Sequence, residues 1–317
     1  MTVAVLNPAA AEPMASPLPG PHAVLTEGLT KRYGREVALE GVNLQAPRGS
    51  VYVLAGANGA GKSTLLRTLM NLSAPNAGRT EVLGLDPRRH GARVRAQVGY
   101  VPEGVETGYR WMTAGRLLDH LSAYYPSWDQ AYAERLSRLL DVRPERRIGR
   151  LSKGQSRRLQ LVAALAHRPP LLLLDEPTDG LDPVARDEVL GLLSEHLADT
   201  GCTILVSTHL VYEVERVAEH LGVLRDGRLV AQAPLDRLHA RLRSYRLEAP
   251  EGWTAPPDLA DRALHRSGPG RELRWTIWGD QPEVTARLAG AGAVVRDVAP
   301  LGLDEAVVTL LRHRTSS

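Results

Sequence analysis

Short apolar runs, separated by glycine-rich turns and amphipathic stretches, recur along most of the chain. Residues 51–55 predict a buried strand, and leucines at helical spacing predict a helix over residues 63–70, directly after a glycine-rich turn. Four consecutive leucines at residues 171–174 predict a strand buried on both faces, which is typical of a parallel sheet. Residues 203–207 predict a further strand. These elements favour an α/β fold with a parallel core sheet.

Two other regions are predicted beside this core. Residues 24–26, 37–39 and 42–44 predict short strands of an antiparallel sheet ahead of the glycine-rich turn. Residues 98–103 predict a strand that ends in a loop, and apolar stripes then predict helices over most of residues 112–140, with a break at Pro126. We therefore expect a helical subdomain, about residues 104–168, packed beside the main sheet.

The two ends of the chain differ from this middle part. Residues 1–22 are rich in Ala and Pro and predict a disordered tail, for which a targeting or regulatory role is the alternative. From about residue 239 the pattern predicts a small α/β unit, with a regulatory or dimer-stabilising role and simple packing as the alternatives. Its expected strands are residues 246–248, 273–278 and 293–295, and its expected helices are residues 282–288 and 303–311. The expected domains are thus residues 1–22, 23–238 and 239–317.

Composition narrows the possible classes of protein. Of 317 residues, 43% are hydrophobic and none is Phe, so a sizeable core must be built mainly from Leu, Val and Ala. The net charge is only +3, without a dense basic patch among aromatics, so nucleic acid is not an expected partner. The single Cys202 cannot form an internal disulfide, and its apolar neighbours favour a buried strand position over a reactive role.

Hydropathy also bears on location. No apolar run approaches the about 18 to 20 residues that span a bilayer, and the first residues do not resemble a signal peptide. We expect a cytoplasmic chain that reaches a membrane only through a partner.

The glycine-rich turn has the pattern of a phosphate-binding loop, Gly56-Ala57-Asn58-Gly59-Ala60-Gly61-Lys62-Ser63-Thr64. Glycines allow backbone N–H groups to face phosphate oxygens, and the N-terminus of the following helix adds partial positive charge. Lys62 would place a full charge at the outer phosphates, and the Ser63 hydroxyl can ligate Mg²⁺. A chance match is disfavoured by the strand, turn and helix around the loop.

Asp175 and Glu176 follow the four leucines, so they should emerge at the carboxyl edge of the sheet, where open α/β sheets bind ligands. Asp175 fits a partner of the Mg²⁺ ion that Ser63 contacts, and Glu176 is placed to polarise a water for attack on a γ-phosphate. The alternative is two acids that merely end a strand.

Three shorter signals are weaker when taken alone. Ser152 predicts an N-cap, with Gly154 allowing close approach of an anion, and Asp182 before Pro183 predicts a second N-cap. His209, at the end of the 203–207 strand, could bond a γ-phosphate, although an isolated histidine more often has no such role. Tyr33, expected in a turn, could stack on an adenine ring or be an ordinary surface residue.

Together and in this order, the motifs resemble those of the ATP-binding subunit of an ATP-binding cassette (ABC) transporter over about residues 23–238. Tyr33 matches the adenine-stacking aromatic, Gly56 to Thr64 the Walker A loop and residues 171–176 the Walker B strand. The run Leu151-Ser152-Lys153-Gly154-Gln155 matches the LSGGQ signature, which other phosphate-loop enzymes lack. Leu181-Asp182 matches the D-loop and His209 the switch histidine.

The resemblance implies a head-to-tail dimer with ATP and Mg²⁺ at its interface. ATP on the Walker A loop of one subunit would be capped by Ser152 and Gly154 of the other, and Glu176 would act in hydrolysis with help from His209. Opening and closing of the dimer would drive separate transmembrane permease subunits, which would hold this chain at the inner face of the membrane.

Two positions depart from the family pattern. Lys153 stands where the signature usually has glycine and would add charge near the facing phosphate, while Glu103 holds the place of the Q-loop glutamine, where it can still bind Mg²⁺ or its water. The LSKGQ signature, the stretch 124–129 and Leu303-Asp304-Glu305-Ala306-Val307 resemble the type-two exporter branch. The alternatives are an importer, whose subunits often carry a β-barrel-like C-terminal domain, and a non-transport member of the family.

Overall fold

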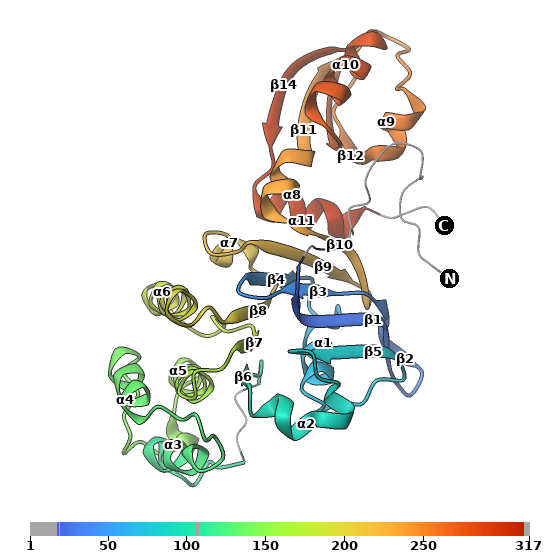
Figure 1. Ribbon diagram of the computed structural model, residues 1–317. Helices are drawn as coiled ribbons and strands as arrows, with labels where there is room; N and C mark the ends of the chain where they lie inside the picture. Colours follow the sequence, from blue (N-terminus) through green and yellow to red (C-terminus); the bar gives the residue numbers. More distant parts are fainter. Residues whose placement is uncertain (1–17, 19, 105–107, 314–317) are drawn as a thin grey trace.

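The computed structural model describes residue 18, residues 20–104 and residues 108–313. Its main sheet has six strands in the order β10-β9-β4-β8-β7-β6 (Figure 1). The predicted parallel core is confirmed for β6 to β7, β7 to β8, β8 to β4 and β4 to β9, while β10 pairs antiparallel with β9. The strands are β4 (Val51–Ala55), β6 (Val98–Val101), β7 (Leu171–Asp175), β8 (Thr203–Thr208), β9 (His220–Arg225) and β10 (Arg228–Pro234).

The central strands read as continuous apolar runs because both faces of this sheet are covered. Along β4, Val51 and Val53 belong to one hydrophobic cluster, whereas Tyr52 and Leu54 belong to another. The alternation follows from the two-residue period of a strand, which sends successive side chains to opposite faces.

A second sheet, antiparallel, consists of β1 (His22–Tyr33), β2 (Glu36–Val42), β3 (Gln45–Pro47) and β5 (Ala77–Val82). The expectation of one strand over residues 42–44 was wrong. β2 pairs with the end of β1 and β3 with its start, so Asn43 and Leu44 cross between them. Tyr33 is also the last residue of β1, paired with Glu36, rather than a turn residue.

The helices of this large part of the chain flank the two sheets. They are α1 (Lys62–Leu69), α2 (Pro87–Arg95), α3 (Ala114–Ser122), α4 (Gln130–Leu139), α5 (Lys153–Leu165), α6 (Pro183–Thr200), α7 (Val211–Val214) and α8 (Leu235–Arg241). The predicted helices on either side of Pro126 are α3 and α4, and Thr113 and Asp129 cap their N-termini. α3, α4 and α5 lie together at one side of the main sheet (Figure 1).

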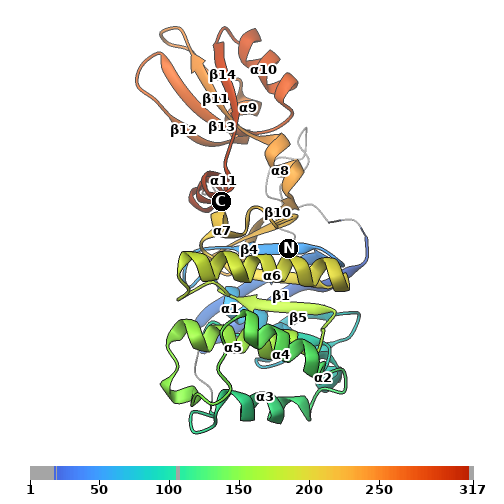
Figure 2. The same ribbon diagram turned by 90° about the vertical axis from the view of Figure 1, so that its left-hand side faces the viewer.

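The C-terminal unit, residues 242–300, forms a third sheet, in the order β12-β13-β11-β14 with every pairing antiparallel. Its elements are β11 (Leu242–Glu248), α9 (Pro257–Arg262), β12 (Ala263–Ser267), β13 (Glu272–Trp278), α10 (Gln281–Gly290) and β14 (Val294–Pro300). This is the split β-α-β, ferredoxin-like arrangement, with its own hydrophobic cluster that includes Tyr245, Trp275 and Ile277. The unit stands apart from the main sheet in Figure 2.

The last helix, α11 (Leu303–Arg312), does not pack within that unit's cluster. Leu303, Ala306, Val307 and Leu310 belong instead to the hydrophobic cluster of β4 and β8. The boundary expected between residues 238 and 239 falls inside α8.

Of the expected N-terminal tail, residues 1–17 and 19 lie outside the described residues. Leu18 is buried and its backbone N–H donates to Gln45, and His22 begins β1.

Candidate functional site

The phosphate-binding pattern lies between β4 and α1, where the backbone has no room for larger residues. A Cβ atom at Gly56 would lie 2.5 Å from the Leu224 carbonyl oxygen, and one at Gly61 would lie 2.4 Å from that of Ala38. Gly61 also has a φ of +106°, which disfavours any residue with a side chain. The loop therefore keeps its glycines because of close backbone approach as well as conformation.

A cleft of about 490 Å³ opens in front of this loop. Half of the predicted site residues line it, and its lining also includes six residues that sequence reasoning did not assign to the site. The predicted residues are Tyr33, Asn58, Gly59, Gly61, Lys62, Ser63, Thr64, Glu103 and Glu176, and the others are Glu36, Val37, Ala38, Arg67, Asp226 and Gly227. Tyr33 is 46% exposed at the rim, and its hydroxyl lies 3.1 Å from Ser73 Oγ.

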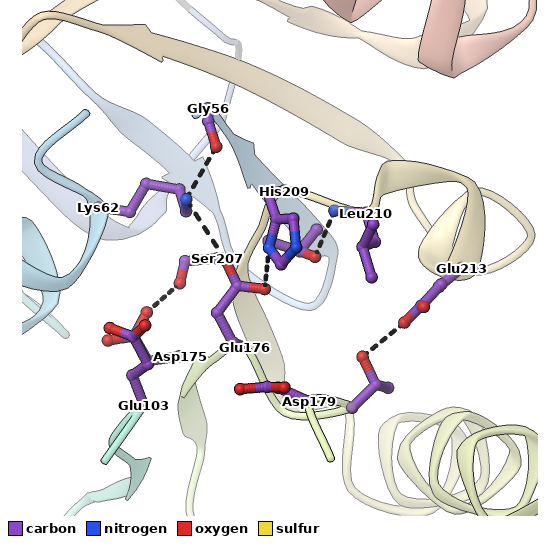
Figure 3. A network of polar contacts seen from close by, with 12 residues as sticks. Gly56, Lys62, Glu103, Asp175, Glu176, Asp179, Ser207, His209, Leu210 and Glu213 are labelled. Atoms are coloured by element: carbon purple, nitrogen blue, oxygen red, sulfur yellow. Dashed lines mark hydrogen bonds and ion pairs between the residues drawn. The ribbon is translucent and has the colours of Figure 1, made fainter. Parts of the chain in front are cut away.

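Lys62 is buried beneath the loop. Its Nζ donates to the carbonyl oxygens of Gly56 at 2.8 Å and Ala57 at 3.3 Å, and lies 3.4 Å from Glu176 Oε1. The ammonium group is therefore held between the phosphate-binding loop and the end of β7 (Figure 3).

Glu176 joins Lys62 to the switch histidine. Its other carboxylate oxygen, Oε2, lies 3.0 Å from His209 Nδ1, and its backbone N–H donates to the Ser207 carbonyl oxygen at 3.0 Å. The Glu176 side chain is only 7% exposed, whereas that of His209 is 39% exposed. Figure 3 shows the carboxylate between the Lys62 ammonium group and the His209 ring.

The expected metal ligands come from three separate segments. Asp175 Oδ1 accepts from the Ser207 hydroxyl, while Oδ2 is buried and has no protein partner within the described residues. Burial raises the pKa of Asp175, and the hydroxyls of Ser207 and Ser63 counter that shift. The Ser63 hydroxyl donates to Glu103 Oε2 at 3.2 Å.

This set fits Mg²⁺ in the way that ATP-dependent proteins use it. Two carboxylates and one hydroxyl are hard oxygen donors, and Mg²⁺ commonly completes its shell with water and substrate phosphates. Among the described residues, no cluster of three or more His, Cys, Asp or Glu side chains forms an all-protein cage. The unpartnered Asp175 Oδ2 is the observation that favours an ion at this place.

The signature loop, residues 151–155, begins α5 away from the cleft lining. Ser152 Oγ accepts from the Gln155 N–H at 3.2 Å, and Gln155 Oε1 accepts from the Ser152 N–H at 3.0 Å, so the two form a capping box. The predicted N-cap at Ser152 is confirmed. Asp182 likewise caps α6 through the Ala185 N–H at 3.0 Å, which lowers the pKa of Asp182.

Lys153 has a partner that the sequence did not indicate. Its Nζ lies 2.6 Å from Asp179 Oδ2, and its aliphatic stem covers Gly180, while a Cβ at Gly154 would lie 2.9 Å from the Gly180 carbonyl oxygen. The charge expected near a facing phosphate is therefore paired within the same chain.

Sequence reasoning also missed Arg157 on α5. It is fully buried, and its guanidinium donates to the carbonyl oxygens of Pro102 at 2.5 Å and Glu103 at 2.7 Å. Burial lowers the pKa of Arg157. A charged residue one turn after a helix cap gives no sequence signal for this role, which joins the signature helix to the segment that carries Glu103.

The fold and the site first define a class of protein, the phosphate-loop ATPases. The defining features are a buried lysine, two acids at the end of a core strand and a histidine directly after the neighbouring strand. A family model described as "ABC transporter" matches residues 39–179. The daunorubicin resistance ATP-binding protein DrrA3 of Streptomyces coeruleorubidus is 37% identical over 298 residues, covering 92% of each chain. The bacitracin transport ATP-binding protein BcrA of Enterococcus faecalis is 32% identical over 228 residues, covering 71% of this chain and 73% of that one.

Solved structures agree with these sequence relatives. An ATP-binding subunit of an ABC transporter superposes with a TM-score of 0.63 at 30% identity, covering 68% of this chain and 92% of that one. A dimeric ATP-binding cassette, in a post-hydrolysis state bound to ADP and Pi, has a TM-score of 0.60 at 26% identity, covering 67% and 98%. The chain belongs to the ATP-binding cassette family of ABC transporters. Among the described residues, no helix has the length and apolarity needed to cross a membrane.

Proposed function

We propose that this chain is the ATP-hydrolysing subunit of an export system, acting with a separate transmembrane permease that holds it at the inner face of the membrane. The observation that carries the proposal is the placement of Glu176 between Lys62 and His209 at a cleft lined by the phosphate-binding loop. Export is supported by relatives named for bacitracin transport, daunorubicin resistance and Nod factor export.

The roles of the residues follow from their positions. Backbone N–H groups of residues 56–61 and the Lys62 ammonium bind the phosphates of ATP. Ser63, Asp175 and Glu103 would hold Mg²⁺, and the charge of the ion would neutralise the phosphates during transfer. Glu176 accepts the proton of the attacking water, and His209 holds that carboxylate in place and can bond the γ-phosphate.

A second copy of the chain supplies the part that the cleft lacks. Ser152, Gly154, Gln155 and Asp182 do not line the cleft of their own chain, and the structural relatives include a dimer. We infer that Ser152 and Gly154 of a partner subunit cap the nucleotide, with Tyr33 against the adenine. ATP then favours the closed dimer because its phosphates contact both subunits only in that state.

Importer ATPases are the nearest alternative to the export assignment. The expected mark of that class was a β-barrel-like C-terminal domain, and the C-terminal unit is instead a ferredoxin-like α/β sheet. We therefore keep export as the proposal, with the permease as the part that selects the substrate.

Replacing Glu176 by Gln tests the hydrolytic role. Glu176→Gln keeps the shape of the side chain but cannot accept a proton, so ATP hydrolysis should fall by at least about a hundredfold while ATP binding persists. The expected product is an ATP-bound dimer, which size-exclusion chromatography with ATP and Mg²⁺ detects. Unchanged turnover would remove Glu176 from the role of base.

Lys62→Ala is the matched contrast in the same cleft. This change removes the phosphate-binding charge, so it should weaken ATP binding itself, and Glu176→Gln should not. Normal ATP affinity in Lys62→Ala, measured by titration with a fluorescent ATP analogue, would contradict the proposed nucleotide site.

A further inference from the structure

The helix that follows the switch histidine cannot cap itself. α7 begins two residues after His209, and its N-cap residue, Leu210, offers no side-chain acceptor. The acceptor comes from the far end of the sequence, because Asp304 Oδ1 lies 3.2 Å from the Tyr212 backbone nitrogen and accepts its N–H. Asp304 lies in the first turn of α11, which contacts α7 (Figure 2).

The last helix, α11, also lacks a side-chain acceptor at its own N-cap, and the residue after α7 provides one. α11 follows Gly302, which has no side chain, and the Leu303 N–H donates to Glu215 Oε1 at 3.4 Å. Glu215 is the residue at the C-terminal end of α7. Each helix therefore provides a carboxylate that accepts one backbone N–H at the N-terminus of the other, as a side-chain cap would.

α11 is itself held firmly against the nucleotide-binding part of the chain. Its apolar face is buried in the main cluster, and Arg225 donates to the carbonyl oxygens of Leu310 and Leu311 at 3.2 Å and to that of His313. The residues after Arg225, Asp226 and Gly227, line the cleft, and the Gly227 N–H donates to the Ala60 carbonyl oxygen at 3.0 Å. α11 thus has a fixed position relative to the phosphate-binding loop.

The opposite side of α7 reaches the segment that carries Glu176. The buried Glu213 carboxylate accepts from Thr178 Oγ1 at 2.6 Å and pairs with Arg186 Nη1 at 2.6 Å. Thr178 lies two residues after Glu176, and His209 precedes α7. A shift of α7 would therefore act both on His209 and on the turn that follows Glu176.

We propose that Asp304 and Glu215 are positioning residues for ATP hydrolysis, which hold α7 so that His209 stays on Glu176. The C-terminal helix thereby controls the hydrolytic step, not the binding of ATP. This inference rests on the proposed roles of Glu176 and His209.

Asp304→Ala is the primary test. Loss of the cap should lower kcat for ATP hydrolysis about fivefold, the equivalent of one helix cap, and change KM for ATP less than about twofold. Asp304→Asn keeps an acceptor oxygen and should restore most of the rate. Glu305→Ala is the matched control, because Glu305 is an exposed acid in the same turn without a hydrogen bond or ion pair among the described residues.

A second readout separates positioning from a general loss of structure. Amides of residues 211–214 should exchange with deuterium faster in Asp304→Ala, while those of β4 and β7 remain unchanged. In a His209→Ala background, single-turnover hydrolysis with radiolabelled ATP should show no additional loss from Asp304→Ala. If Asp304→Ala does not fold, Glu215→Ala removes the other cap and carries the same expectations.

The proposal is overturned if Asp304→Ala hydrolyses ATP at the wild-type rate, if Glu305→Ala matches its loss, or if the loss persists without His209. Glu176→Gln is assayed in parallel. If that variant retains turnover, the proposed function itself fails, whereas its inactivity beside a fully active Asp304→Ala would refute only the positioning role.

Discussion

Glu176 has the least ordinary backbone of the candidate catalytic residues. Its φ is +49°, in the left-handed region that residues with a side chain rarely adopt, at a typical cost of about 1–3 kcal/mol. The chain tolerates this conformation because the Glu176 N–H donates to the Ser207 carbonyl oxygen and the carboxylate has partners on both sides. The turn directs the side chain back toward Lys62 instead of along the strand. Unusual backbone geometry therefore coincides with the residue proposed as the base.

Motif residues were predictable one by one, whereas their partners were not. Lys62, Asp175 and Glu176 come from contiguous patterns whose chemistry is local. The pairing of Lys153 with Asp179 joins residues 26 apart, and Arg157 bonds Glu103 across 54. Hydrophobic periodicity contains no information about such contacts, because they depend on how the elements pack.

His196 provides a pH-dependent test of stability. Burial lowers the pKa of His196 to about 4, and its Nδ1 lies 3.0 Å from the Tyr132 hydroxyl. The folded state thus favours the neutral ring, while the unfolded chain binds a proton near pH 6.5, so stability present above that pH is lost as pH falls toward 4. One such histidine accounts for about 1.4 kcal/mol per pH unit over this range.

We expect His196→Leu to reduce the difference in free energy of unfolding between about pH 7 and pH 5 by roughly 2 kcal/mol relative to wild type. Urea denaturation at both values measures it. His265→Leu serves as control, because His265 is exposed, and an equal reduction in both variants would refute burial as the cause.

At the scale of elements, the signature helix α5 is linked to the turn after β7 by an ion pair, and a hydrogen bond within that turn continues the link to Glu176. The Lys153 ammonium pairs with Asp179, and the Asp179 N–H donates to the Glu176 carbonyl oxygen at 3.1 Å. The loop proposed to meet ATP on a partner subunit is therefore attached, within its own chain, to the turn that carries the proposed base. Because this pair is half exposed, its contribution to stability is small.

The two charges of the Lys153–Asp179 pair should affect ATP affinity in opposite directions. Asp179→Asn leaves Lys153 unpaired and should lower KM for ATP about twofold to threefold, whereas Lys153→Ala leaves Asp179 unpaired and should raise KM by a similar factor. The double variant should lie near wild type. Shifts in the same direction, or shifts that persist at about 1 M salt, would contradict a screened charge effect.

Strongly patterned elements were predictable, and short or polar ones were not. β4, β7 and β8 stood out as continuous apolar runs, and Asp182 before Pro183 marked the start of α6. β5 (Ala77–Val82) exposes half of its residues and contains Gly78, so it resembles a loop. α7 has only four residues, too few to show a helical stripe.

At the scale of the whole molecule, the cleft is an incomplete enclosure. The phosphate-binding loop lines it, whereas the signature loop of the same chain does not. The family resemblance of the sequence motifs indicates the same division. By contrast, the ferredoxin-like order of the C-terminal sheet was not predictable, since β12 and α9 are short and strand order depends on packing.

Cross-linking between chains tests the proposed nucleotide site between two subunits. The single Cys202 is 1% exposed and should not react, so any disulfide cross-link must come from the introduced cysteines. In a Glu176→Gln background, a mixture of Asn58→Cys and Ser152→Cys chains should cross-link with ATP and Mg²⁺, and neither variant should do so alone. A chain that carries both Asn58→Cys and Ser152→Cys should not cross-link internally at high dilution. An internal cross-link would contradict the head-to-tail arrangement.

The position of α11 has a practical consequence for work on the C-terminal unit. Apart from Leu264, Trp278 and Leu301, residues 243–302 lie outside the main cluster, and α11 rejoins it at Leu303. The ferredoxin-like unit therefore stands between two segments that pack in that cluster. Truncation from the C-terminus removes cassette core first and the ferredoxin-like unit second. Exchange of this unit between relatives therefore requires two junctions, one on each side of the sheet, with the final helix retained.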